Sequence, residues 1–241
     1  MTNARTARQQ KVATLREAER RRGRARRRLV VIAAVAGVLL IAVGTTIGVG
    51  LGSGSTSESA SRPVVAPAGV SPPSGPIVVG KASAPNTIDL YEDFQCPVCH
   101  EFENTNRATV EQAVAAGRAK VNYHIMSFIG TESVRAANAA GCAQDAGRFL
   151  AFHDYLYDHQ PKEDSGGYTS ADLVAAGAAI GLKTPAFRQC VAAMTHQSWV
   201  SASNNAGLDV TNGTPYVVVN GTPVSNWNDP TVLQQTLTAA R

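Results

Sequence analysis

Cysteine is scarce in this chain, with four residues in 241. Only Cys96 and Cys99 lie close together, whereas Cys142 and Cys190 are each solitary. A zinc site built on one cysteine pair needs a second pair of ligands at matching spacing. The lack of a second pair argues against zinc, and we expect no metal site.

Charge is absent between Leu29 and Leu51, where Val, Ile, Leu, Ala and Gly predominate. This stretch is long enough to cross a bilayer core of about 30 Å at about 1.5 Å per residue. It exceeds the apolar core of about 7–15 residues in a cleaved signal peptide. We predict an uncleaved transmembrane signal anchor at residues 29–51. The alternative is a cleaved signal peptide. A buried helix of a soluble domain is a further interpretation, and the flanking basic residues argue against it.

Basic residues are few outside one short arm. Eleven of the 22 Lys and Arg residues lie in residues 1–28, so the rest of the chain is mildly acidic although the net charge is +4. A basic arm can bind nucleic acid. Beside an apolar span, however, the positive-inside rule places it in the cytoplasm and the following residues outside. We expect a single-pass cell-membrane protein with a cytoplasmic arm at 1–28 and no nucleic-acid partner.

Residues 52–76 have the composition of a flexible linker. Gly and Ser fill residues 52–57 apart from one threonine, and five prolines follow before residue 77. Such a segment cannot bury a core of its own. The remaining residues, 77–241, are enough for one compact domain.

The hydrophobic pattern of that domain predicts strand, helix, strand, a helical block, a hairpin and a last helix. The expected ranges are a strand at 87–91, a helix at 97–116, a strand at 121–126, helices within 131–206, strands at 216–219 and 222–224 around an Asn-Gly turn, and a helix from 230. Three expected helix starts are Ser133, the Thr169–Asp172 capping box and Thr184 followed by Pro185.

Cys96-Pro97-Val98-Cys99 joins the first predicted strand to the first predicted helix. A thioredoxin-type redox pair occupies this position. We expect Cys96 to be the attacking thiol, because the amino end of a helix favours a thiolate and lowers the thiol pKa below its usual value of about 8.5. The same effect favours the reduced form, so the disulfide is a better oxidant. Cys99, one turn further on, is the expected resolving thiol.

Neighbouring polar residues leave other interpretations open. Cys96 to His100 also spells C-x-x-C-H, the haem attachment motif, although the thioredoxin-like order of elements argues against haem. His100 is expected beside the pair, partly exposed, with a modest effect on the thiol pKa. Glu92 and Asp93 are candidate acids near Cys99, but we expect them to face solvent. The other histidines show no ligand spacing and are expected to be structural: His124, His153, His159 and His196.

The chain resembles the DsbA-like branch of the thioredoxin superfamily in its membrane-anchored form. Three features carry this resemblance over residues 77–241: the segment Asp93–His100, the helical insertion at about 131–206, and Gly213-Thr214-Pro215 before a strand. It implies an α/β thioredoxin fold with a helical insertion and no cofactor besides a redox-active disulfide. It also implies that Pro215 is cis and faces the pair, so that Thr214 and Pro215 bind an extended substrate peptide through the backbone. Val98 departs from the best-known relatives, which carry His there, and this leaves the oxidising strength open.

Cys142 and Cys190 need an explanation of their own. Outside the cytoplasm an even cysteine count usually means pairing. We predict a structural disulfide between them within the helical insertion. The alternative is a second redox pair that relays electrons.

Three functions fit these features. The favoured one is a thiol oxidase that introduces disulfides into reduced, unfolded secreted proteins. The resemblance implies reoxidation by a membrane quinone-linked partner, either DsbB-like or vitamin K epoxide reductase-like. The alternatives are a reductase or isomerase of extracytoplasmic disulfides, including one for cytochrome maturation, and a non-enzymatic membrane-tethered binding module.

Overall fold

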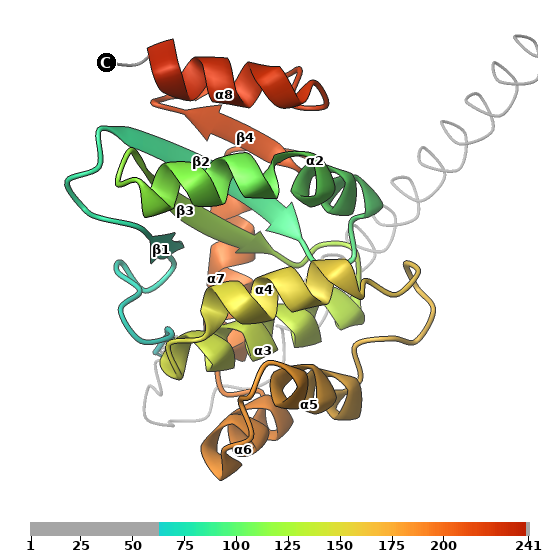
Figure 1. Cartoon of the computed structure of the whole chain (residues 1–241). Coiled ribbons are helices and arrows are strands. Elements are labelled where there is room, and N and C mark those ends of the chain that lie inside the picture. Colours follow the sequence, from blue (N-terminus) through green and yellow to red (C-terminus); the bar gives the residue numbers. More distant parts are fainter. Residues whose placement is uncertain (1–62, 240–241) are drawn as a thin grey trace, which may run out of the picture. The chain divides into compact units, whose positions relative to one another are not determined.

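The computed structural model describes residues 63–239 (Figure 1). The predicted arm at 1–28, the predicted span at 29–51 and the first part of the predicted linker lie outside the described residues. Between residues 63 and 239, no helix is both long and apolar enough to cross a membrane.

A five-stranded sheet forms the centre of the domain, in the order β1-β3-β2-β4-β5. Strands β2 and β3 are parallel, and the other neighbouring strands are antiparallel. In the first half of β2 and through most of β3, alternate residues are buried, as the pattern predicts, whereas the last four residues of β2 are all buried. Asn220 and Gly221 form the predicted turn between β4 and β5, both with positive φ. The strands are β1 Ile77–Val79, β2 Asn86–Asp93, β3 Ala119–Met126, β4 Tyr216–Val219 and β5 Thr222–Pro223.

Helices cover both faces of the sheet. Figure 1 shows α2 (Pro97–Ala115) in front of the sheet and α7 (Gln197–Leu208) behind it. The last helix, α8 (Pro230–Ala239), packs against α2, and α7 packs against β3. Helix α2 begins with Pro97, which is favoured at the first helical position because a backbone N–H there would have no partner within the helix. The helix ends just before Gly117, which has a φ of +67°. The sheet is therefore buried on both sides, and α2 lies directly after the central strand β2.

The helical insertion between β3 and α7 lies below the sheet in Figure 1. Helix α5 begins with the predicted capping box of Thr169 and Asp172, and α6 begins with the predicted Thr184 cap. A disulfide joins Cys142 on α3 to Cys190 on α6. The four helices of the insertion are α3 Thr131–Asp145, α4 Phe149–Asp158, α5 Ser170–Ala179 and α6 Pro185–Ala193.

Ser133 is not a helix cap, contrary to the sequence prediction. Helix α3 begins at Thr131 after Gly130, so Ser133 lies inside its first turn. The Ser133 side chain is fully buried and accepts a hydrogen bond from Gln95 Nε2 at 3.0 Å. A tertiary contact beside Cys96 thus explains this serine better than a local one does. The short strand β1, with only three residues, also lacked a predictive pattern.

The second half of the predicted linker packs against the domain. The Val65 N–H donates to Ser198 Oγ at 2.8 Å, and the Ala68 N–H donates to Asp145 Oδ1 at 2.7 Å. Pro67 is buried, and Trp199 Nε1 donates to the Gly75 carbonyl at 3.2 Å. Here prolines supply apolar surface without unpaired N–H groups. Residues 65–75 therefore belong to the folded domain and are not the tether that their composition predicted.

Candidate active site

Cys96 is the N-cap residue of α2, placed there by a short turn after β2. Its carbonyl accepts hydrogen bonds from the N–H groups of Cys99 (3.1 Å) and His100 (3.2 Å). Cys96 is 7% exposed, and its sulfur lies 3.4 Å from the Thr214 carbonyl oxygen, to which the protonated thiol can donate, whereas Cys99 is 0% exposed. The Thr214–Pro215 bond is cis, as the resemblance implies. The structure thus brings together residues of α2 and of the loop before β4, 118 positions apart.

The two thiols have pKa values shifted in opposite directions. The pKa of the Cys96 thiol is lowered to about 6. The largest cause is a hydrogen bond from Cys99, which outweighs the opposing effect of burial. The Thr214 side chain and the backbone of Cys99 and Val98 lower it further. Burial, followed by the hydrogen bond to Cys96 and the negative charge of Glu92, raises the pKa of Cys99 well above its usual value. Near neutral pH the reduced pair therefore holds a thiolate at Cys96 and a protonated thiol at Cys99.

This asymmetry predicts how pH affects the stability of the reduced protein. Unfolding returns the pKa of Cys96 from about 6 to about 9, so the unfolded chain binds the extra proton between these values. The free energy of unfolding should rise with pH across that range, and this contribution should disappear as pH falls through 6. Urea unfolding of the reduced wild type and of reduced Cys96→Ser, from pH 5.5 to 8.5, measures it. The difference between the two proteins should grow with pH, and a constant difference would contradict the assigned thiolate.

Glu92 and Asp93 are buried, 1% and 0% exposed, and the expectation that they face solvent is wrong. Strand β2 runs to Asp93, two residues further than predicted, in the centre of a sheet covered on both faces. Asp93 Oδ1 accepts from the Gln95 N–H at 3.0 Å, and its Oδ2 accepts from the Ile129 N–H at 3.3 Å. Asp93 therefore fixes the turn that leads into Cys96.

A buried charge cluster is formed by Glu92, Glu103 and His153. One carboxylate oxygen of each glutamate and one ring nitrogen of the histidine all lie within 4.8 Å of one another. His153 Nε2 is 3.1 Å from Glu92 Oε2, and His153 Nδ1 is 3.0 Å from Asp154 Oδ1. Burial and the charge of Glu103 raise the pKa of Glu92 to about 8. For His153, burial acts against protonation, but Glu103, Asp154 and Glu92 together raise its pKa to about 10. Both shifts favour the protonated forms, so this buried cluster, on the strand before the redox pair and on the helices beside it, retains protons more readily than free side chains do.

Sequence reasoning missed this cluster because its members come from β2, α2 and α4, with no local spacing in common. His153, which was expected to be structural, is fully buried and pairs with Glu92 and Asp154. His100 is partly buried, and its Nδ1 lies 2.8 Å from the Tyr157 carbonyl. Cys99 is completely buried, so in this fold it is not accessible to a haem vinyl group.

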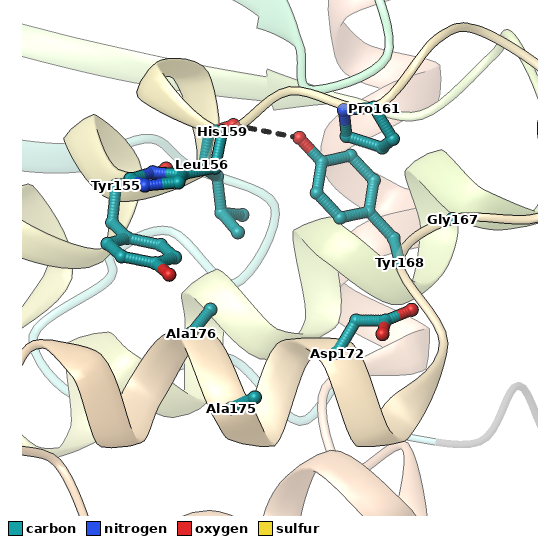
Figure 2. Close-up of a pocket in the computed structure, with 9 residues that line it drawn as sticks. All are labelled: Tyr155, Leu156, His159, Pro161, Gly167, Tyr168, Asp172, Ala175 and Ala176. Atoms are coloured by element: carbon teal, nitrogen blue, oxygen red, sulfur yellow. Dashed lines mark hydrogen bonds between the residues drawn. The ribbon is translucent and has the colours of Figure 1, made fainter.

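A cavity of about 390 Å³ lies near the active site but does not include either cysteine of the pair. Its walls come from α4, α5 and the loop between them, as Figure 2 shows. The Tyr168 ring forms part of the wall, and its hydroxyl lies 3.0 Å from the Leu156 carbonyl (Figure 2). The same hydroxyl lies 3.3 Å from the Phe94 carbonyl. Tyr168 thus connects this cavity to the segment before Cys96.

Comparison with known proteins gives matches that span most of the domain. A family model described as Thioredoxin matches residues 73–239. The serine/threonine-protein kinase PknE of Mycobacterium tuberculosis is 29% identical over 175 residues, which cover 65% of this chain and 30% of the kinase. The probable disulfide bond formation protein D of Bacillus cereus is 32% identical over 100 residues, which cover 40% of this chain and 45% of that protein.

Solved structures include a similar protein. The oxidised DsbA of Mycobacterium tuberculosis superposes with a TM-score of 0.61 and 25% identity, covering 68% of this chain and 92% of that one. The chain spans less than half the length of the two curated relatives, and the part of PknE that it matches is under a third.

Proposed function

Because the chain belongs to the thioredoxin family and is a DsbA-like member of it, we propose that it is an extracytoplasmic thiol:disulfide oxidoreductase that oxidises secreted proteins. One observation carries this proposal: Cys96 is the N-cap residue of α2, with its sulfur 3.4 Å from the carbonyl of the cis Thr214–Pro215 segment, and Cys99 of the same pair is fully buried. A stabilised thiolate favours the reduced pair, so the disulfide gives up its oxidising equivalents readily. The similarity to a probable disulfide bond formation protein supports the same direction.

The proposed reaction has two exchange steps. A substrate thiolate attacks Cys96 Sγ, the Cys96–Cys99 bond breaks, and Cys99 leaves and takes up a proton because its pKa is raised. Glu92, whose pKa is raised by burial and by Glu103, is a buried acid at the end of β2 that can supply it. A second substrate thiolate then attacks the substrate sulfur of the mixed disulfide, and Cys96 leaves as a stabilised thiolate. The substrate loses two electrons and two protons; the pair gains the two electrons and one proton, on Cys99, and the other proton goes to solvent.

We propose that Thr214 and Pro215 hold the substrate peptide beside Cys96. The Thr214 carbonyl already lies 3.4 Å from the sulfur, and an extended peptide can pair with backbone groups there. Val98 and Phe128 offer apolar contacts, since they are 43% and 40% exposed. They follow the ends of β2 and β3, which are parallel and end together at Asp93 and Met126. Recognition of this kind depends little on sequence and suits many unfolded substrates.

We also propose that residues 29–51 anchor the protein in the cell membrane, with residues 1–28 in the cytoplasm and the catalytic domain outside. The uncharged span and the eleven basic residues before it support this orientation. The reduced pair would be reoxidised by a membrane quinone-linked protein, DsbB-like or vitamin K epoxide reductase-like. Protease added to intact cells should digest the catalytic domain; protection until the membrane is permeabilised would contradict this topology.

The function is tested by mixing the oxidised full-length chain with a reduced, unfolded protein that contains two cysteines. One substrate disulfide should form for each Cys96–Cys99 pair reduced, and repeated turnover should require an added oxidant. Mass shifts after alkylation measure both reactions. If the chain instead reduces substrate disulfides, it is a reductase or isomerase. If no electrons are exchanged, a binding module would replace the proposed enzyme.

A further inference from the structure

Gln160 connects the helical insertion to the segment that carries Cys96. It lies just after α4, and its side-chain Nε2 donates to the Phe94 carbonyl at 2.8 Å and to the Cys96 carbonyl at 3.0 Å. An amide nitrogen has two protons, and these two bonds use both of them. We call residues 94–96 the active-site turn and residues 159–168 the clamp loop. One side chain of the clamp loop thus holds both ends of the active-site turn.

Two further contacts join the clamp loop to the active-site turn. The Tyr168 hydroxyl lies 3.3 Å from the Phe94 carbonyl, and Tyr168 is buried. From the other side, Gln95 Oε1 accepts from the Asp164 N–H at 3.2 Å, while Gln95 Nε2 donates to Ser133 Oγ. All three residues of the active-site turn therefore bond to the helical insertion or its loop.

The Cys96 carbonyl is an important point of attachment. It accepts from the N–H groups of Cys99 and His100 and so closes the first turn of α2. The Cys96 sulfur belongs to the N-cap residue of α2, where the helix dipole favours a thiolate. A group that fixes the Cys96 carbonyl consequently fixes the Cys96 backbone relative to the first turn of α2.

We propose that Gln160 is a positioning residue that acts through the Cys96 carbonyl to hold Cys96 and its sulfur in place at the N-terminus of α2. Through these bonds the clamp loop of the helical insertion sets the reactivity of the nucleophile. The consequence for oxidation of substrates rests on the proposed function, but the reactivity of the thiol can be measured without it.

The test compares Gln160→Met with Gln144→Met in the reduced full-length chain. Methionine keeps the length of glutamine but has no N–H donor. Gln144 is a matched control, because its Nε2 also donates to a backbone carbonyl, that of Ala68 at 3.0 Å, but it lies at the C-terminal end of α3 and does not contact the active-site turn through this bond. The pH dependence of Cys96 alkylation by iodoacetamide and the equilibrium of the pair with glutathione are measured for both variants.

Gln160→Met should raise the pH midpoint of Cys96 alkylation. At a given pH below the midpoint, the fraction of Cys96 present as thiolate should be about three-fold lower than in the wild type. The equilibrium constant for oxidising glutathione should fall by about three-fold, which is about 14 mV for a two-electron couple. Gln144→Met should match the wild type in both measurements. Tyr168→Phe, which removes only a hydroxyl, should shift both in the same direction by a smaller factor.

Equal midpoints and equilibria for Gln160→Met and Gln144→Met would overturn the proposal even if the wild type oxidises substrates. If Gln160→Met does not fold, as judged by thermal unfolding, Tyr168→Phe decides: an unchanged midpoint overturns the proposal. A shifted midpoint in a protein that never oxidises substrates would support the positioning role and refute the proposed function instead.

Discussion

Cys99→Ser is expected to trap the protein in mixed disulfides with its substrates, whereas Cys96→Ser should form none. With Cys99 replaced, the Cys96 thiolate can still attack a substrate disulfide in the reverse of the proposed reaction, so that a mixed disulfide forms and one substrate sulfur leaves as a thiolate. Cys99, whose thiolate would attack Cys96 Sγ and release the substrate, is then missing. With Cys96 replaced, only a fully buried thiol remains, and its pKa lies well above the usual value. Less than about 1% of such a thiol is thiolate at pH 7, so the exchange rate should fall at least about 100-fold.

Non-reducing gels of cells that express each variant measure this result. Adducts that disappear on reduction should be abundant for Cys99→Ser and absent for Cys96→Ser. The double variant Cys142→Ala/Cys190→Ala should behave as the wild type does and serves as the control. Adducts on Cys96→Ser would show that another cysteine is the nucleophile and would contradict the assigned roles.

Removing the disulfide between Cys142 and Cys190 should cost stability without changing the redox pair. The disulfide closes a loop with a sequence separation of 48 and ties α3 to α6. In the chain-entropy model, a loop of this size is worth about 4 kcal/mol. Urea unfolding of the oxidised Cys142→Ala/Cys190→Ala variant should show a loss of that size. The alkylation midpoint of Cys96 should stay at its wild-type value.

Mild dithiothreitol gives an independent test of the same disulfide. The Cys96–Cys99 disulfide should open first, because its reduced form is stabilised, and Cys142–Cys190 should resist. If both open together, and the double variant loses electron transfer while keeping its stability, then Cys142 and Cys190 form a second redox pair. That outcome would replace the structural role with the relay alternative.

Features that depend on neighbouring residues could be predicted from the sequence. The strand, the CxxC pair and the helix that follows are adjacent in the chain, so their arrangement follows from local pattern. The same holds for the Thr169 and Thr184 caps and for the Asn220–Gly221 hairpin, each of which is complete within a few residues. Proline at position 97 marked the first residue of α2 correctly.

Features that depend on tertiary contacts could not be predicted in this way. Glu92 looked exposed because acidic residues usually are, and only the central place of β2 explains its burial beside His153. Ser133 has the chemistry of a cap but bonds to Gln95. The two bonds of Gln160 reach residues 66 and 64 positions away, which no local pattern reveals.

The reduction potential of the Cys96–Cys99 pair, measured in glutathione buffers on the full-length chain, tests the central claim most directly. A pair whose thiolate is stabilised by the active-site turn should be strongly oxidising, with a potential near −120 mV. A potential near −270 mV, typical of a reductant, would contradict the proposed oxidase.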